Sequence, residues 1–359
     1  MEGKLEDRLE NIRNNFERNG IDGLIVMRPE NRRYASGFTG TAGMLFITLD
    51  SAWLFTDFRY DEQAKSEAAC YCVEKYNNKP TEALVPVVGK TGCKMIGFEK
   101  DFITYQDHEK LSGALDRVDF IPTENIIENL RAKKDRDEIE AQSKAALIAD
   151  KAFNAICNYV KEGMKEKEIA LEIDYRMRKF GSEGNSFPTI VASGPRASLP
   201  HAGPSCKEVQ RGEFLKMDFG ATYNGYCSDL TRTVALGEYD GKQKEIYEVV
   251  LMAQKKALAG IQAGKKGIDV DRIARDFIAS AGYGDNFGHG LGHGVGLFIH
   301  EAPSLSPKGS SVLEAGNVVT IEPGIYIPGW GGVRIEDLVK VTENGHENLT
   351  SSPKELLTI

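Results

Sequence analysis

The chain has 359 residues, of which 41% are hydrophobic and 27% are charged. This composition is ordinary for a soluble globular protein, and the length exceeds what one hydrophobic core normally supports, so two domains are expected. The formal net charge of -8 offers no basic surface to a phosphate backbone, which argues against a nucleic-acid partner.

The start of the sequence is charged throughout. Residues 1–20 lack the apolar run and the small-residue cleavage site of a signal peptide, and no stretch reaches membrane-spanning length. The six cysteines show no C-x-x-C spacing, which argues against a disulfide framework or a zinc ribbon. We therefore expect a cytoplasmic protein with no membrane partner.

The first third of the chain predicts an α/β domain. It opens with apolar residues at helical spacing that a glycine follows as a stop: Leu5, Leu9, Ile12, Phe16 and Gly20. Three short apolar runs separated by turn-rich segments then predict strands over residues 23–27, 44–48 and 52–56. The sequence next becomes strongly polar, so we predict a first domain over residues 1–124 and a linker over 125–134.

Residues 135–359 predict an α+β domain with a substantial antiparallel sheet. Apolar residues at helical spacing predict four helices, one from the boundary to Ile156 and three over residues 166–180, 243–261 and 270–281. Alternating or β-branched segments predict strands over residues 187–192, 213–221, 231–236, 318–327 and 336–342.

Two aspartates stand in strand-like surroundings. Asp218 lies within the apolar run 214–219, and Asp229 directly precedes the next strand-like segment. A buried carboxylate loses its hydration, which is costly unless a cation or several hydrogen-bond donors compensate. A hairpin would bring these two carboxylates together. Taken alone, however, Asp218 is better explained by an ion pair with a nearby lysine or arginine.

Three of the six histidines cluster in one short segment, at positions 289, 293 and 300. Glycines flank His289 and His293 and allow the backbone to approach a metal or a substrate closely. Histidine is the commonest side-chain metal ligand, but the spacing differs from the helical H-E-x-x-H of zinc peptidases. A lone histidine here would be a hydrogen-bonded core residue, whereas the cluster favours a functional site.

Two glutamates complete the pattern, since Glu322 and Glu336 each follow apolar strand residues and are poorly placed for a solvated surface. Four carboxylates and one imidazole form a hard, mostly oxygen ligand set that suits two closely spaced Mn²⁺, Zn²⁺, Co²⁺ or Fe²⁺ ions. Such ions lower the pKa of a bridging water and polarise a carbonyl, which is hydrolytic chemistry. The candidate ligands are Asp218, Asp229, His293, Glu322 and Glu336.

In these motifs the chain resembles the family that contains methionine aminopeptidase, aminopeptidase P and prolidase, whose catalytic domain has the pita-bread fold. The family's ligand order of Asp, Asp, His, Glu and Glu matches the five residues above, with each surrounding motif intact. The resemblance implies that Asp218 chelates one ion, that Asp229 and Glu336 bridge both, and that His293 and Glu322 complete the other. Mn²⁺ is the metal we expect.

The resemblance also implies roles around the metal. His201 and His300 match substrate-contacting histidines that bind the scissile carbonyl, and His289 matches a further histidine at the pocket. Glu322 matches the general base, a role in which it accepts a proton from the bridging water. Arg334 matches an arginine of the proline-directed branch, where methionine aminopeptidases carry glutamine.

The first domain narrows the function further. Residues 31–40 and 56–60 resemble the creatinase-type N-terminal domain, which typical methionine aminopeptidases lack and which implies a homodimer. We therefore predict a metal-dependent aminopeptidase P, which hydrolyses the bond between the N-terminal residue of a peptide and a following proline. An Xaa-Pro dipeptidase, or prolidase, is the alternative, because product length depends on whether a loop blocks the space beyond proline.

Other classes of protein have the same fold or a similar cluster of residues. A creatinase-like hydrolase and a non-enzymatic peptide- or protein-binding module would be expected to have lost the metal ligands, all five of which are present here. A structural protein whose buried carboxylates only pair with arginines would bind no metal.

Overall fold

The structure is a computed structural model that describes residues 2–359. The chain divides into two compact units, the first ending at Arg131 and the second running from Ala132 to Ile359. The segment 125–134, predicted as a linker, contains helix α7 (Ile126–Ala132). Among the described residues, no helix is both long and apolar enough to cross a bilayer.

The first unit is built on a six-stranded sheet. Its strand order is β4-β3-β2-β1-β5-β6, in which β1, β2 and β3 form an antiparallel meander and the outer pairs are parallel. The strands are β1 (Gly23–Val26), β2 (Met44–Thr48), β3 (Ala52–Thr56), β4 (Cys72–Lys75), β5 (Met95–Glu99) and β6 (Asp119–Thr123). Two of the three predicted strands have their predicted bounds, and β1 ends one residue earlier.

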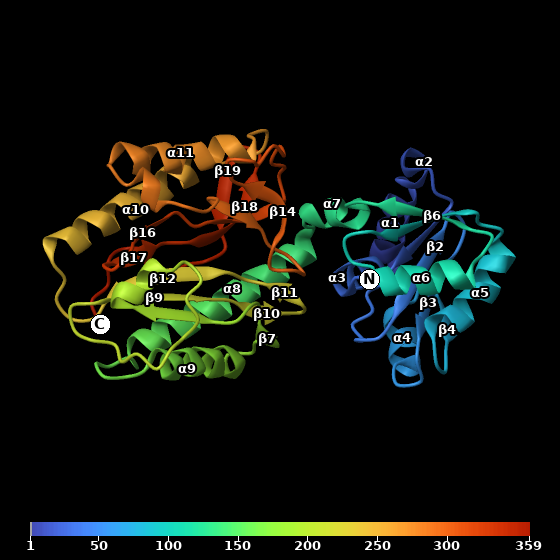
Figure 1. Cartoon of the computed structure of the whole chain (residues 1–359), viewed down its shortest axis with the longest axis horizontal. Helices are drawn as coiled ribbons and strands as arrows, with labels where there is room; N and C mark the ends of the chain where they lie inside the picture. The colour runs from blue at the N-terminus through green and yellow to red at the C-terminus, as the bar shows by residue number, and fades with distance from the viewer. Residues whose placement is uncertain (1) are drawn as a thin grey trace. The chain divides into compact units, whose positions relative to one another are not determined.

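Helices surround this sheet (Figure 1). They are α1 (Glu2–Arg13), α2 (Phe16–Asn19), α3 (Pro29–Ser36), α4 (Asp61–Glu67), α5 (Pro80–Thr91) and α6 (Tyr105–Ala114). The predicted opening helix is therefore broken between α1 and α2, and Gly20 ends α2 in the left-handed conformation at φ 64°. Leu84 of α5 and Leu111 of α6 pack with Phe46 and Phe55 of the strands in one apolar core.

The second unit places its strands between two pairs of helices. Figure 1 shows α8 and α9 along one outer side and α10 and α11 along the other. Capping boxes start α8 at Asp135 with Glu138 and α10 at Asp240 with Gln243, which satisfies backbone N–H groups at both helix starts. The bounds are α8 (Arg136–Cys157), α9 (Glu166–Lys179), α10 (Gly241–Gly260) and α11 (Gly267–Ser280).

Antiparallel strands form the centre of this unit. The sheets are β12-β9-β8, β11-β10-β7, β14-β13-β15-β18-β19 and the pair β16-β17. The strands are β7 (Gly184–Asn185), β8 (Ile190–Ser193), β9 (Phe214–Phe219), β10 (Ala221–Tyr223), β11 (Tyr226–Cys227), β12 (Leu230–Ala235), β13 (Gly292–Gly294), β14 (Glu301–Leu305), β15 (Val318–Ile321), β16 (Gly324–Ile327), β17 (Gly331–Arg334), β18 (Asp337–Thr342) and β19 (Gly345–Asn348).

Two predicted strands were wrong in their continuity. The segment 213–221 contains β9 and the start of β10, which belong to different sheets. The segment 318–327 forms two strands, β15 and β16, that belong to different sheets. The break falls at Glu322 and Pro323, because proline has no N–H to give to a sheet ladder. The interruption leaves Glu322 at the end of β15.

Candidate metal centre and active site

A hairpin brings the two aspartates together. Asp218 of β9 pairs in register with Thr231 of β12, and Asp229 directly precedes β12. Side chains two residues apart on extended backbone project to the same face, as do directly paired residues. Asp229 therefore projects to the face of Thr231 and of Asp218, and both carboxylates are buried.

Glycines allow His293 to approach the same point. β13 lies between β14 and β15, and a Cβ on Gly292 would collide with the carbonyl oxygen of Thr320. The Nδ1 atom of His293 lies 3.1 Å from the carbonyl oxygen of Gly294. A carbonyl can only accept, so Nδ1 carries the proton and the Nε2 lone pair is left for a ligand.

The two glutamates come from strand ends. The amide of Glu322 donates to the carbonyl of Leu291 at 2.8 Å, and its Oε1 accepts from the hydroxyl of Thr320 at 3.0 Å. Glu336 lies between β17 and β18, where its Oε2 accepts from the hydroxyl of Thr231 at 2.6 Å. Among residues 2–359, its Oε1 is buried with no hydrogen-bond partner.

This arrangement fits a bound cation. Three carboxylate oxygens lie within 4.8 Å of one another, one each from Asp218, Asp229 and Glu336. The Nε2 of His293 lies 3.6 Å from Oδ2 of Asp229 and 3.4 Å from Oε1 of Glu322. A lone pair that faces carboxylates is unfavourable unless a proton or a metal ion lies between them. Burial lowers the pKa of His293, which disfavours the proton.

The electrostatics of the carboxylates lead to the same conclusion. Burial, together with the charges of Glu336 and Asp218, raises the pKa of Asp229 well above its usual value. Burial and the charges of Glu322 and Asp218 do the same to the pKa of Glu336. Burial raises the pKa of Glu322 to about 7. These carboxylates crowd together in a site that lacks enough positive charge without a cation.

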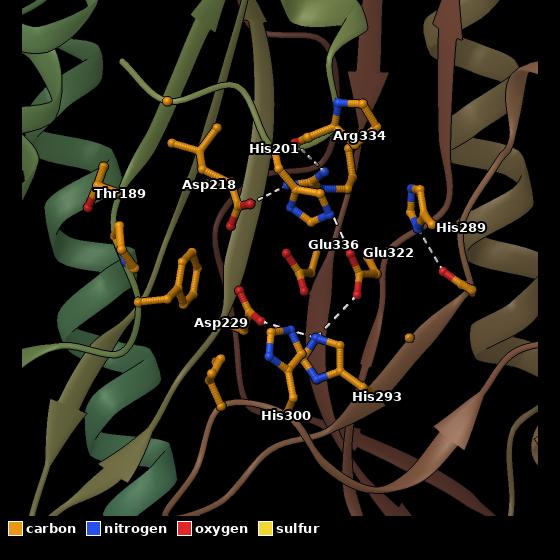
Figure 2. A pocket seen from close by; sticks show the side chains of 18 of the residues that line it. Thr189, His201, Asp218, Asp229, His289, His293, His300, Glu322, Arg334 and Glu336 are labelled. Carbon is orange, nitrogen blue, oxygen red and sulfur yellow. Dashed lines mark hydrogen bonds and ion pairs between the residues drawn. The ribbon is translucent and has the colours of Figure 1, made fainter.

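The carboxylates border a cavity of about 560 Å³. His201 and His300 also line it, and in the view of Figure 2 they lie at opposite ends of the carboxylate group. The rings of His300 and His293 pack with their centroids 4.4 Å apart. Burial lowers the pKa of His300, so its ring is neutral near pH 7. Apolar residues form another part of the wall: Phe187, Pro188, Ile190, Pro200 and Ile299.

Arg334 is buried beside the ligands and is held on several sides. Its guanidinium donates to the carboxylate of Asp218, to the hydroxyl of Thr231 at 2.9 Å and to the hydroxyl of Tyr326 at 3.0 Å. Neighbouring negative charge raises the pKa of Arg334 despite its burial. The arginine thus orients Asp218. The ion pair between them is the alternative that the sequence left open for Asp218. The Nε of Arg334 also lies 3.9 Å from Oε2 of Glu322, but one positive charge cannot compensate four carboxylates.

Both ring nitrogens of His289 are occupied. Nε2 lies 2.9 Å from the hydroxyl of Tyr326, and Nδ1 lies 2.8 Å from the carbonyl of Gly290. Since Tyr326 accepts from Arg334, its own proton is available to His289 Nε2. Burial lowers the pKa of His289 to about 4, so the ring stays neutral.

Sequence reasoning missed two residues that hold the site together. Thr231 contacts both Glu336 and Arg334, and Tyr326 joins Arg334 to His289. Thr231 carried a usable signal, because it lies two positions after Asp229 and therefore on the same strand face. Tyr326 carried none, since its partners are distant in the sequence or belong to another strand.

Comparison with known proteins identifies the family. Residues 140–343 match the profile of metallopeptidase family M24, and residues 8–133 match that of the creatinase/prolidase N-terminal domain. The chain therefore belongs to metallopeptidase family M24, with a creatinase-type N-terminal domain before a catalytic domain of the pita-bread fold.

Relatives match over nearly the whole chain. The structure of an Xaa-Pro dipeptidase from Bacillus anthracis is 45% identical with a TM-score of 0.97, covering 99% of this chain and 100% of that one. An X-Pro aminopeptidase from Thermotoga maritima is 39% identical with a TM-score of 0.92, covering 98% and 100%. An Xaa-Pro dipeptidase of Pyrococcus furiosus is 40% identical over 98% of this chain and 100% of its own length.

Proposed function

We propose that this metallopeptidase hydrolyses the bond between the N-terminal residue of a peptide and a following proline. The observation that carries the proposal is the buried group of carboxylates with the Nε2 of His293 aimed at it, on the wall of a peptide-sized cavity. The names of the relatives support proline as the second residue. The apolar part of the wall suits a pyrrolidine ring.

We assign two divalent ions to Asp218, Asp229, His293, Glu322 and Glu336. When bound, such ions lower the pKa of a water molecule and polarise the scissile carbonyl. Glu322 would accept a proton from the attacking water, and His201 and His300 would bind the carbonyl oxygen, while Arg334 keeps Asp218 in place. His289 acts by holding Tyr326 rather than by touching substrate, because both of its ring nitrogens are occupied.

The lining of the cavity favours an aminopeptidase over a dipeptidase. A dipeptide would bring its C-terminal carboxylate next to proline, where a cation should compensate it. Among the described lining residues, the one arginine or lysine is Arg334, and its guanidinium already serves Asp218, Thr231 and Tyr326. A longer peptide carries a neutral amide at that position. The 45% identity to an Xaa-Pro dipeptidase keeps the dipeptidase as the second candidate.

Three substrates separate the two candidates: Xaa-Pro, its C-terminal amide and Xaa-Pro-Yaa, each offered to metal-stripped protein with Mn²⁺, Co²⁺ or Zn²⁺ restored. An aminopeptidase cleaves the amide and the tripeptide faster than the free dipeptide, whereas a dipeptidase requires the free carboxylate. Asp218→Ala and a peptide with alanine in place of proline are the controls. Lack of metal-dependent cleavage of all three would refute the proposal. The manganese and the homodimer remain predictions of the resemblance, and the cytoplasmic location remains a prediction of the sequence.

A further inference from the structure

The position of His201 depends on the backbone that carries it. His201 lies in the loop between the 3₁₀ helix Gly194–Ser198 and β9, and it is exposed at the cavity wall. Within residues 2–359, its ring has no hydrogen-bonding partner. A ring without partners can be held at a reacting carbonyl only if the loop beneath it is fixed.

A buried lysine holds that loop. Lys216 of β9 is 0% exposed, and its Nζ donates to the carbonyl of Leu199 at 2.7 Å and to those of Ala197 and Pro200 at 3.2 Å. Burial and the charge of Arg334 lower the pKa of Lys216 to about 6. Carbonyl oxygens can only accept, however, and only a protonated amine has the three N–H donors that these three contacts require. Two of the three carbonyls belong to the residues directly before His201.

Other residues also contact the loop. The carboxylate of Glu166 accepts hydrogen bonds from Ser193, Arg196 and Ser205, which lie at or near the two ends of the segment. Arg334 also donates to the carbonyl of Pro200, at 3.2 Å, but it is shared among several partners. Arg196 also donates to the carbonyl of Gly203 at 2.7 Å, on the far side of His201. Lys216 is thus the residue devoted to the stretch of the loop directly before His201.

We propose that Lys216 is a positioning residue that fixes His201 against the substrate carbonyl. The inference rests on the proposed function, because that function gives His201 its contact with substrate. Lys216 and Asp218 lie two positions apart on β9 and project to one face. One strand therefore positions both a metal ligand and, through the loop, a substrate-binding histidine.

A double-mutant cycle with Lys216→Met and His201→Ala tests this inference. Misplacing His201 by about 1 Å should lower kcat/KM for Xaa-Pro-Yaa by about 10- to 100-fold in Lys216→Met. In the His201→Ala background the same substitution should cost less than about twofold, because nothing is left to position. The isotope exchange of backbone amides over residues 194–206, measured on the metal-loaded chain, should become faster in Lys216→Met.

Lys207→Met is the matched control. Lys207 also donates three hydrogen bonds, to Ser193, Glu208 and Glu213, but none to residues 197–200. Its substitution should leave the effect of His201→Ala unchanged. If Lys216→Met does not fold, Lys216→Arg replaces it, because a planar guanidinium cannot converge on three carbonyls as an ammonium does.

Three results would overturn the inference. Additive losses from Lys216→Met and His201→Ala, or unchanged exchange over residues 194–206, would mean that Lys216 does not position His201. A loss of bound metal in Lys216→Met would mean that it acts through Asp218. If the wild type cleaves no Xaa-Pro peptide, the proposed function fails, whereas the exchange experiment still reports on the loop.

Discussion

Removing one buried charge should stabilise the metal-free protein while it abolishes hydrolysis. Burial raises the pKa of Glu322 from 4.5 to about 7, so its folded-state pKa lies above its unfolded one. Between these values the folded chain holds a proton that the unfolded chain releases, and stability falls as pH rises through the window. At roughly 1.4 kcal/mol per unit of pKa, the ionised carboxylate costs about 3 kcal/mol above pH 7.

Glu322→Gln removes that cost. With its amide nitrogen at the position of Oε1, the glutamine can donate one N–H to the Nε2 of His293 and the other to the hydroxyl oxygen of Thr320. Its amide oxygen then faces Arg334, so both ends of the amide keep a partner. We expect the metal-free variant to match the wild type near pH 4.5 and to exceed it by as much as about 3 kcal/mol at pH 8. Hydrolysis by the metal-loaded variant should be lost.

Urea unfolding in the presence of EDTA at pH 5, 6, 7 and 8 measures this difference. A Trp53→Phe background leaves Trp330 as the one tryptophan, so fluorescence reports on the second unit. Glu347→Gln is the control, because the side chain of Glu347 is 59% exposed and its pairing with Lys340 contributes little. A variant no more stable than the wild type at pH 8, or a difference that does not change with pH, would refute the reasoning.

Two further perturbations address the metal and the hydrogen bonds around it. The free energy of unfolding of the metal-stripped protein should rise by about 2.7 kcal/mol per ion when the ion is restored at 100 times its Kd, which corresponds to roughly 5 to 10 °C in Tm. Asp218→Ala should abolish this gain. An unchanged Tm by calorimetry would contradict a metal centre. Tyr326→Phe removes the hydroxyl between Arg334 and His289 and should lower the free energy of unfolding in urea by about 1 to 2 kcal/mol. It should also lower kcat/KM, while elemental analysis finds the metal content unchanged. Normal stability and activity would show that the contact is dispensable.

Local sequence patterns predicted much of the fold. The strands β2 and β3 and the helices α8 to α11 follow from apolar spacing, which fixes the face that each element buries. The break between β15 and β16 was missed although Pro323 marks it, because the apolar residues continue on both sides. Spacing within the sequence also cannot reveal that the two strands belong to different sheets.

The ligand motifs were readable because each lies within one strand or at its end. The structure brings Asp218, Asp229 and Glu336 together and places His293 and Glu322 beside them. The supporting residues were harder to predict, because their role depends on long-range contacts. Lys216 could be assigned to the face of Asp218 from alternation, but its partners are carbonyls of a loop, and no side-chain pattern marks a carbonyl acceptor.

The wide separation of the ligands in the sequence bears on how the protein is made. The hairpin that carries Asp218 and Asp229 is synthesised first, and Glu336 follows only after α10, α11 and most of the second sheet. Until those later segments have emerged from the ribosome, the aspartates therefore lack the partners that complete the site. Hydrolytic activity can begin only when folding of the second unit is essentially finished, so an incomplete chain is not a prematurely active peptidase.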